Sequence, residues 1–169
     1  GAGGGAAAVL FAMQGWQGVN ARVFSRTQQG GAQLIDRFKV PAEVARSAEE
    51  AVKGATLVIN ATPIGLKDDT VPVSVHALDK ECAVFDLAYR LNETAFVKDS
   101  RARGHRALDG LTMLVEQGAL SFERWSGGAP DKIVIAYQAI PNGDLDRNDR
   151  TEREEGWAPL IDTPMHPEY

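Results

Sequence analysis

Apolar and polar residues follow two different periods along the chain, and the two periods alternate. Segments with apolar residues at helical spacing, or rich in alanine and free of proline, predict helices over residues 6–13, 28–38, 47–54, 94–103 and 111–125. Segments with alternating or continuous apolar residues predict strands over residues 20–25, 55–61 and 82–89. Strands separated by helices are typical of an α/β fold, a parallel sheet with helices on both faces.

Two of these segments predict the centre of the sheet. ATLVINA (55–61) and CAVFDLAY (82–89) are nearly continuous apolar runs, which favours strands buried on both faces. Parallel sheets of this kind bind ligands outside the carboxyl ends of their strands. The residues that follow each strand are therefore the first candidates for a binding site.

Composition predicts one globular domain followed by an acidic tail. The chain has 169 residues, of which 44% are hydrophobic, and we expect the domain to cover residues 1–140. Residues 141–169 are polar and proline-punctuated, so we expect a disordered tail. Residues 142–169 hold eight acidic residues and three arginines, so they account for the net charge of −5. Residues 131–140 (DKIVIAYQAI) are compatible with a helix or a strand.

Several classes of function are disfavoured by the same composition. The domain is neutral overall and has no basic face that would point to nucleic acid. No apolar stretch is long enough to predict a membrane span, and no signal peptide is recognisable. The single cysteine, Cys82, lies in an apolar run and predicts a buried thiol. We therefore expect a cytoplasmic protein without a nucleic-acid or membrane partner, and the oligomeric state stays open.

The chain opens with a glycine turn that leads into a helix. Gly1-Ala2-Gly3-Gly4-Gly5-Ala6 fits the pattern G-x-G-x-x-A, in which glycines allow a tight turn and a close approach to phosphate. The amino end of the following helix offers free N–H groups and a positive dipole end to an anion. A glycine-rich linker would look similar, so the motif depends on its context.

The second candidate is Ser25-Arg26-Thr27, at the end of the first expected strand. Enzymes that use NAD usually carry an acidic residue here for the ribose hydroxyl, and enzymes that use NADP carry an arginine for the 2′-phosphate. Residues 20–33 contain no acid. The Arg26 guanidinium and the two hydroxyls therefore favour NADP, although an ordinary solvated arginine fits the same three residues.

The remaining strand ends carry further polar groups. Asn60-Ala61-Thr62 closes the strand expected over residues 55–61, where a turn is the simplest reading, and Leu87 and Tyr89 close the next strand. On the last helix, Met113 and Gln117 are four residues apart and therefore lie on one face. We expect the Gln117 amide to point toward the same edge of the sheet as Gly110. The three histidines are scattered without neighbouring cysteines or carboxylates at metal spacing, so we expect no metal site.

Together these motifs resemble the C-terminal, NADP-binding half of the shikimate dehydrogenases. GAGGGA resembles the phosphate loop of that family, FSRT its N-R-T motif, and NATPIG its N-A-T-P-x-G turn. DLAYRLNET is similar to its D-x-x-Y-x-P-x-x-T segment, and DGLTMLVEQGALSFERWSG to its G-x-x-M-L-V-x-Q-G-A-x-x-F-x-x-W helix. These motifs occur in the same order over residues 1 to 130.

The resemblance implies a fold, a reaction and a set of site residues. The fold is a Rossmann-type doubly wound parallel sheet, and the reaction is the NADPH-dependent reduction of 3-dehydroshikimate to shikimate, a step toward chorismate and the aromatic amino acids. The implied NADP(H) contacts are Gly1, Gly3, Gly4, Gly5, Ala6, Ser25, Arg26, Thr27, Asn60, Ala61, Thr62, Leu87, Gly110 and Met113. The implied substrate contacts are Tyr89 and Gln117.

Within that set, the family assigns different parts of the ligands to different motifs. Gly3–Gly5 would hold the pyrophosphate, Arg26 and Thr27 the 2′-phosphate, and residues 60–62 the nicotinamide-side ribose. Leu87 and the Gly110 backbone would line the nicotinamide, and Tyr89 and Gln117 would reach the hydroxyl or carboxylate end of the substrate.

The chain also departs from the family pattern. Ser25 replaces the usual asparagine, Gly30 stands near the place of a second basic residue, and Leu91 replaces a proline. We therefore expect Arg26 alone to hold the 2′-phosphate and the selectivity for NADP to be reduced.

The resemblance implies that two parts of the enzyme lie upstream of Gly1. One is the first, central strand of the sheet, and the other is a substrate domain with the lysine and aspartate that handle the proton. We expect this chain to be a C-terminal piece that lacks its first strand and carries no catalytic residue. Such a piece should be inactive by itself, and poorly stable or prone to self-association because two strand edges are bared.

Two alternatives stay open at this stage. A quinate/shikimate dehydrogenase or a shikimate dehydrogenase-like paralogue would differ in substrate and in its acceptance of NAD. A non-catalytic nucleotide-binding or interaction module would use the acidic tail to contact a partner.

Overall fold

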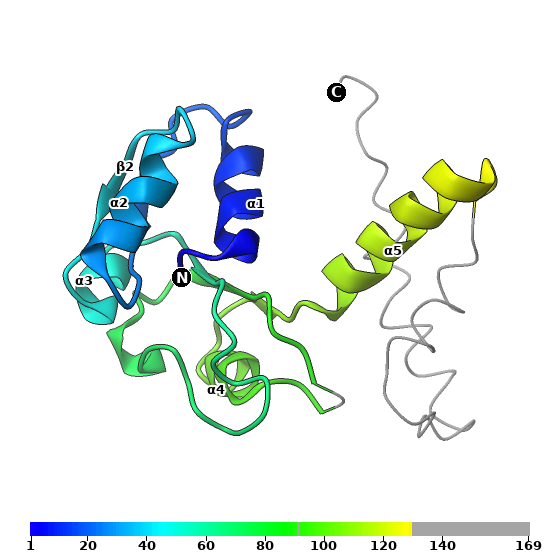
Figure 1. Cartoon of the computed structure of the whole chain (residues 1–169). Coiled ribbons are helices and arrows are strands. Elements are labelled where there is room, and N and C mark those ends of the chain that lie inside the picture. Colours follow the sequence, from blue (N-terminus) through cyan, green and yellow to red (C-terminus); the bar gives the residue numbers. More distant parts are fainter. Residues whose placement is uncertain (91, 130–169) are drawn as a thin grey trace. The chain divides into compact units, whose positions relative to one another are not determined.

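A computed structural model describes residues 1–90 and 92–129 of the chain (Figure 1). The chain divides into two compact units, Gly1–Leu114 and Val115–Tyr169. The helices are α1 (Gly4–Met13), α2 (Gln28–Asp36), α3 (Ala48–Val52), a 3₁₀ helix η1 (Val75–Ala77), α4 (Ala95–Ala102) and α5 (Leu111–Ser126). The strands are β1 (Ala21–Val23), β2 (Ala42–Val44), β3 (Leu57–Asn60), β4 (Ala83–Asp86) and β5 (Ala107–Leu108).

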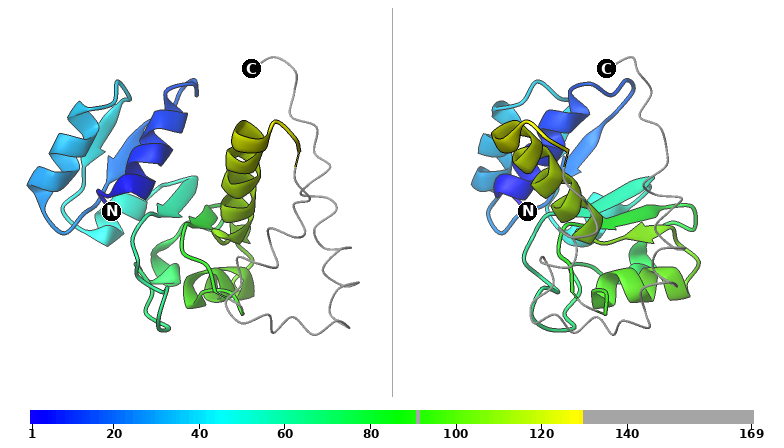
Figure 2. Two further views of the ribbon diagram at one scale, coloured as in Figure 1. Left: turned by 45° about the vertical axis from the view of Figure 1, so that its right-hand side comes forward. Right: turned by 90° about the vertical axis from the view of Figure 1, so that its right-hand side faces the viewer.

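The strands of the first unit are parallel and form two sheets. β1 pairs with β2, with Ala21 opposite Ala42, and β4 lies between β3 and β5, with Leu57 opposite Ala83 and Val84 opposite Ala107. Helix α4 packs against β4 and β5, and Figure 2 shows it on one side of this sheet. The expectation of an α/β fold with parallel strands and intervening helices is confirmed.

Between β1 and β3 the structure departs from the expected burial. In the described residues neither strand has a partner on the side that faces the other. The side chain of Leu57 is 40% exposed, and Val58 and Ile59 are only half-buried. The prediction that the 55–61 run is buried on both faces is therefore wrong, because β3 lies at an edge. The prediction holds better for β4, whose Val84 and Asp86 are buried.

Three short elements gave no usable sequence signal. β2 is three residues long and contains Glu43, β5 has only two residues, and η1 is a single turn. Segments this short cannot show a period of two or of 3.6 residues. The other helix and strand predictions agree with the structure to within a few residues at their ends, as is usual for element boundaries.

Hydroxyl side chains cap the first turns of three α-helices. Thr27 caps α2 by accepting a hydrogen bond from the Gly30 N–H, Ser47 caps α3, and Thr94 caps α4 by accepting from Val97. A cap of this kind stabilises a helix by about 1 kcal/mol. Helix α1 has no such cap, because its cap residue is Gly3 and no side chain accepts from its first turn.

The apolar core of the first unit consists of two clusters. One gathers α1, α2 and β1 around Leu10, Val23 and Leu34. The other lies around β4 and α4 and includes Phe96, Val97 and Cys82, which are nearly inaccessible to solvent. The prediction that Cys82 is buried is confirmed.

Some expectations fall outside the described residues. These are the acidic tail over residues 141–169, the domain boundary near residue 140, and the choice between helix and strand for residues 131–140. Among residues 1–90 and 92–129, no helix combines the length and hydrophobicity required to cross a membrane.

Candidate dinucleotide-binding site

The glycine turn leaves the start of α1 open. Gly3 caps the helix with extended backbone, and the first intrahelical bond runs from Ala7 N–H to the Gly3 carbonyl at 3.0 Å. A Cβ atom built on Gly3 or Gly4 would meet nothing within 4 Å. No acidic side chain lies in the first turn. The unsatisfied N–H groups and the positive end of the helix dipole therefore face free space that an anion can occupy.

The same turn is held between the ends of neighbouring strands. The Gly1 nitrogen donates to the Phe24 carbonyl at 2.6 Å, just beyond β1. A Cβ atom on Gly1 would lie 2.3 Å from the Ala61 carbonyl oxygen, just beyond β3. A Cβ atom on Gly5 would lie 3.0 Å from Leu87 Cδ1. Only glycine fits at position 1, and the turn touches three strand ends.

Ser25, Arg26 and Thr27 form the turn from β1 into α2. The Ser25 hydroxyl donates to the Thr27 carbonyl at 2.7 Å, and the Thr27 hydroxyl accepts from the Gly30 N–H at 3.2 Å. These bonds stabilise the turn. The hydroxyl hydrogen of Ser25 is engaged within the turn. Helix α2 starts beside the glycine turn, since a Cβ on Gly30 would lie 3.8 Å from the Ala2 Cβ.

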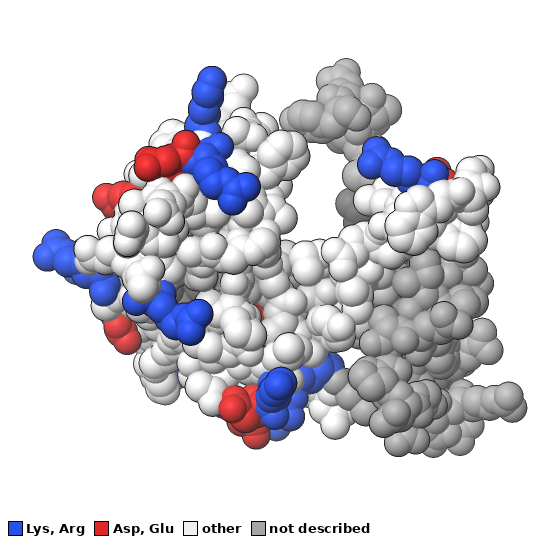
Figure 3. Space-filling model, in the orientation of Figure 1, with Lys and Arg blue, Asp and Glu red and all other residues white. Residues whose placement is uncertain are grey.

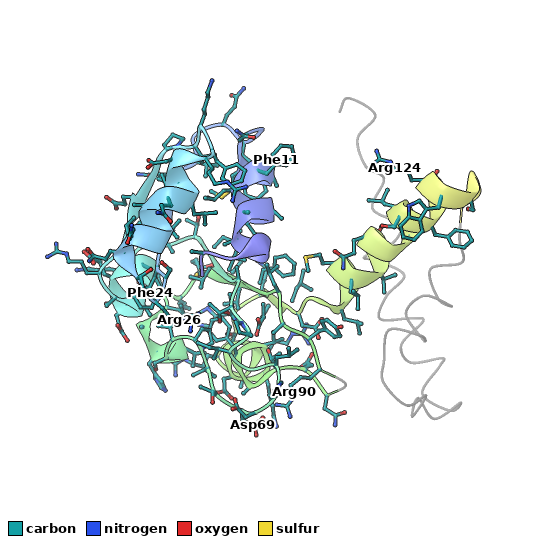
Figure 4. The ribbon with its side chains drawn as sticks, in the orientation of Figure 1. Phe11, Phe24, Arg26, Asp69, Arg90 and Arg124 are labelled. Carbon is teal, nitrogen blue, oxygen red and sulfur yellow. The ribbon has the colours of Figure 1, made fainter. Side chains whose placement is uncertain are left out.

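Arg26 is the charged group that this turn presents. The residue is exposed, and no hydrogen bond or ion pair links it to another described residue. Figure 4 shows Arg26 close to Phe24, by the lower end of α2. On the face in Figure 3, positive and negative side chains are scattered without a broad field of one sign. An anionic ligand would therefore be recognised by individually placed groups such as this guanidinium.

Asn60 lies at the end of β3, and its side chain is fully hydrogen-bonded. Nδ2 donates to Asp86 Oδ1 at 2.8 Å and to the Ile64 carbonyl at 3.1 Å. Oδ1 accepts from the N–H and the hydroxyl of Thr62 at 3.1 and 2.6 Å. The residue is 3% exposed. The Asn60 amide thus stabilises the 60–64 turn through these hydrogen bonds. Its side chain has no free group for a ligand, so a ligand would contact the backbone of the turn.

Asp86 is a carboxylate buried at the end of β4. Oδ1 accepts from Asn60 and from the Ala88 N–H at 3.0 Å, and Oδ2 accepts from the Thr94 hydroxyl at 2.7 Å. No cation pairs with it among the described residues. Burial raises the pKa of Asp86, and the hydrogen bonds from Thr94, Ala88 and Asn60 offset part of that increase.

The Asn60–Asp86–Thr94 cluster was missed by sequence reasoning as a unit. An aspartate at the end of an apolar strand and a threonine before a helix were both visible. The signal that joins them is tertiary, because the three residues come from β3, β4 and the start of α4. The cluster holds two loops of the site in register, the 60–64 turn and the 87–94 segment.

Leu87 and Gly110 meet at the same edge. Leu87 N–H donates to the Asn60 carbonyl at 2.9 Å, and a Cβ atom on Gly110 would lie 2.1 Å from the Leu87 carbonyl oxygen. Tyr89 follows and is half-buried, with no hydroxyl bond to another described residue. Of the predicted residues on α5, Met113 is 36% exposed in the first unit, and Gln117 is exposed in the second.

Two titratable side chains in and beside the β3–β4–β5 sheet are closed to solvent. Asp86 is inaccessible, and His105 is buried with Nδ1 at 3.1 Å from the Cys82 carbonyl oxygen. The described residues hold no cluster of three or more histidine, cysteine or carboxylate side chains suited to a metal. The arrangement is that of a platform for an anionic, extended ligand along the carboxyl ends of parallel strands.

A parallel α/β fold with a glycine turn gathered among its strand ends defines a Rossmann-type nucleotide-binding domain. The family model of the Shikimate 5'-dehydrogenase C-terminal domain matches residues 110–133. The NADP(+)-dependent shikimate dehydrogenase of Methanocella arvoryzae is 38% identical over 144 residues, which are 82% of this chain and 53% of that protein. The chain is thus homologous to the C-terminal half of the shikimate dehydrogenases, as the five motifs indicated.

Solved structures agree with this assignment. The shikimate 5-dehydrogenase of Thermus thermophilus, in complex with NADP(H) and shikimate, superimposes with a TM-score of 0.70 at 35% identity, over 83% of this chain and 53% of that one. Quinate dehydrogenase from Corynebacterium glutamicum, in complex with NAD, gives a TM-score of 0.71 at 29% identity, over 80% and 51%. The chain spans about half the length of the curated relatives it matches.

Proposed function

We propose that the chain is the cofactor-binding half of an NADP-dependent shikimate dehydrogenase, which reduces 3-dehydroshikimate to shikimate in chorismate and aromatic amino acid biosynthesis. The observation that carries the proposal is the uncapped glycine start of α1, in contact with the Arg26 turn and the ends of β3 and β4. The similarity to NADP(+)-dependent shikimate dehydrogenases over four-fifths of the chain supports it. A cytoplasmic setting is part of the proposal.

The residues present fit NADP(H). Open space over Gly3 and Gly4 leaves room for a pyrophosphate against the N–H groups of α1. Arg26, exposed and free of other described partners, would pair with the 2′-phosphate, and the Thr27 hydroxyl would add a bond. The full proposed contact set is Gly1, Gly3, Gly4, Gly5, Ala6, Ser25, Arg26, Thr27, Asn60, Ala61, Thr62, Leu87, Gly110 and Met113.

When bound, NADPH supplies the hydride that reduces the ketone. This chain's part is to hold and orient the dinucleotide. The close packing of Gly110 on the Leu87 carbonyl gives a rigid wall at the nicotinamide end, and the Asn60–Asp86–Thr94 cluster fixes the adjoining loops. Tyr89 and Gln117 are the proposed contacts to the hydroxyl or carboxylate end of the substrate.

Proton transfer to the reduced oxygen must come from outside the described residues. Asp86, at the end of β4, is inaccessible to solvent, and the relatives are about twice as long as the region they share with this chain. We propose that the lysine and aspartate of the family's substrate domain fill this role, and that the chain by itself binds cofactor without turnover.

The test is a titration of the chain with NADPH and, separately, NADH, followed by nucleotide fluorescence. We expect NADPH to bind more tightly, and addition of shikimate with NADP to produce no NADPH. Turnover by the chain would contradict the assignment of the catalytic pair elsewhere. Failure of both nucleotides to bind to a chain that is folded by circular dichroism would contradict the proposed site.

A second candidate is a quinate/shikimate dehydrogenase that accepts NAD. The similarity to the NAD complex of quinate dehydrogenase, and Ser25 in place of the family asparagine, favour it. Equal affinity for NADH and NADPH in the same titration would support this candidate over the first.

A further inference from the structure

A loop of residues 65–70 continues the 60–64 turn and returns to its own start. Gly65 has a φ of +87°, in the left-handed region that favours glycine. A Cβ atom on Gly65 would lie 3.2 Å from the Thr70 carbonyl oxygen and 3.9 Å from the Thr94 Cβ. The two ends of the loop therefore meet beside the start of α4.

Arg90 holds the middle of this loop. Its Nη1 donates to the Asp69 carboxylate, with 2.6 Å between Nη1 and Oδ1, and to the Asp68 carbonyl oxygen at 3.2 Å. Asp68 is itself held within the loop, because its Oδ1 accepts from the Thr70 N–H at 3.0 Å. Figure 4 shows Asp69 and Arg90 close together at the lower edge of the view. The two bonds from Arg90 form a link between segments that we call the Arg90 clamp.

Tyr89 lies between this clamp and a rigid segment. On the other side of Tyr89, the Ala88 N–H donates to Asp86 at 3.0 Å, and the Ala88 carbonyl accepts from the Gly110 N–H at 3.1 Å. Tyr89 is half-buried, and within the described residues neither its backbone nor its hydroxyl forms a hydrogen bond. The position of Tyr89 therefore depends on its two neighbours, Ala88 and Arg90.

The Arg90 clamp contributes little to the stability of the whole fold. The Asp69 side chain is 85% exposed and the Arg90 side chain is 34% exposed. An exposed ion pair is weakened by water and restricts two side chains, so it stabilises a folded chain only slightly. The effect of the clamp is local, because it joins two surface segments that are 21 residues apart in the sequence.

We propose that the Arg90 clamp holds Tyr89 in place at the nicotinamide end of the site, which makes Arg90 a positioning residue for the substrate contact. The inference rests on the proposed function, which assigns Tyr89 to the substrate. The clamp also links Tyr89 to the cofactor, because the 65–70 loop continues the turn whose residues 60–62 are proposed to contact the nicotinamide-side ribose. Cofactor binding at that turn therefore reaches Tyr89 through Arg90.

The experiment follows Tyr89 by fluorine NMR in the full chain, with fluorotyrosine in place of tyrosine. The chain has three tyrosines, so Tyr89→Phe identifies the Tyr89 resonance by its loss. We expect Arg90→Ala to shift that resonance toward its position in the chain unfolded by urea, and to leave the thermal midpoint nearly unchanged. Arg90→Lys keeps the charge but not the planar donor group, so it should restore part of the native shift.

A control variant and salt separate the clamp from general effects of charge. Arg46→Ala removes a different exposed ion pair, in which Arg46 Nε lies 3.6 Å from Glu50 Oε1, and it should leave the Tyr89 resonance unchanged. In about 1 M sodium chloride the screening length falls to about 3 Å. We expect this salt to move the native Tyr89 resonance toward that of Arg90→Ala, and to move the resonance of the variant much less.

Addition of NADP⁺ tests the link to the cofactor. We expect NADP⁺ to shift the Tyr89 resonance of the native chain, and to shift it less in Arg90→Ala although that variant still binds the nucleotide. Failure of NADP⁺ to bind either protein would overturn the proposed function and the link to the cofactor. The spectra without nucleotide would still decide whether Arg90 holds Tyr89.

Three results would overturn the role of Arg90. One is an unchanged Tyr89 resonance in Arg90→Ala. Another is an equal shift in Arg46→Ala, which would indicate a general effect of removing a surface charge. The third is a large fall in the thermal midpoint of Arg90→Ala that Arg90→Lys does not restore, which would identify a role in the fold as a whole.

Discussion

Asn60 and Asp86 are 26 residues apart in the chain, and a buried hydrogen bond of 2.8 Å joins Asn60 Nδ2 to Asp86 Oδ1. The two residues end adjacent parallel strands, and each also holds the loop that follows it. Because Thr94 binds the other carboxylate oxygen, three segments of the proposed site depend on one side chain. This relationship makes Asp86 a positioning residue.

Removing the Asp86 carboxylate should destabilise the fold. Asp86→Ala leaves Asn60, Thr94 and the Ala88 N–H without their acceptor, at a cost of about 1–3 kcal/mol for each buried group left unsatisfied. Asp86→Asn keeps the shape and some of these bonds, so it should cost less. Urea unfolding of the native chain and of the two variants measures these costs. If all three proteins had the same free energy of unfolding, the cluster would not contribute to stability.

The stability contribution of Asp86 should depend on pH. Burial raises its folded-state pKa above the unfolded value of about 3.9, so the folded chain binds this proton more tightly. Stability from this group therefore falls as pH rises from the unfolded to the folded pKa and is constant above that window. Half-buried Asp109, whose pKa is also raised by desolvation, acts in the same direction, whereas the lowered pKa values of exposed Glu49 and Asp68 act in the opposite direction.

The comparison with Asp86→Asn isolates that contribution, because the other carboxylates are common to both proteins. The free energy of unfolding of the native chain minus that of the variant should be largest at low pH and should decrease as pH rises. Urea unfolding over a series of pH values measures it. A difference that grows with pH would contradict the sign of the pKa shift.

Arg26 should determine the preference for NADPH. Arg26→Ala removes the guanidinium proposed to bind the 2′-phosphate, a charged hydrogen bond worth about 1.5–3 kcal/mol, so NADPH affinity should fall roughly tenfold to a hundredfold. NADH affinity should change little. Arg103→Ala, which removes an exposed positive charge at the end of α4, is the matched control. Equal losses for both nucleotides, or for both variants, would place Arg26 outside the 2′-phosphate site.

Two glycines of the turn should respond differently to alanine. A Cβ at position 4 meets nothing within 4 Å, so Gly4→Ala should fold normally but weaken NADPH binding by occupying space proposed for pyrophosphate. A Cβ at position 1 would lie 2.3 Å from the Ala61 carbonyl oxygen, so Gly1→Ala should lower the thermal midpoint. Calorimetry and nucleotide titration test both, and normal NADPH affinity in Gly4→Ala would argue against the phosphate position.

Local residue patterns were enough to predict the class of fold, most helices, three strands and the order of the site motifs. Periodicity, caps and glycine turns act over a few residues, so they can be recognised without knowing what packs against them. The glycine turn, the Ser25–Thr27 turn and the 60–62 turn were all recognisable in this way. The structure brings them to one edge, as a parallel sheet requires.

How these motifs are held, and what lies between them, became visible only in three dimensions. The Asn60 amide is buried in hydrogen bonds with Asp86 and Thr62, and the Ser25 hydroxyl serves its own turn. Among the described strands, β3 is paired on one side only despite its apolar sequence. Burial and buried hydrogen bonding depend on neighbours that are distant in the chain, so a local pattern of residue types cannot fix them.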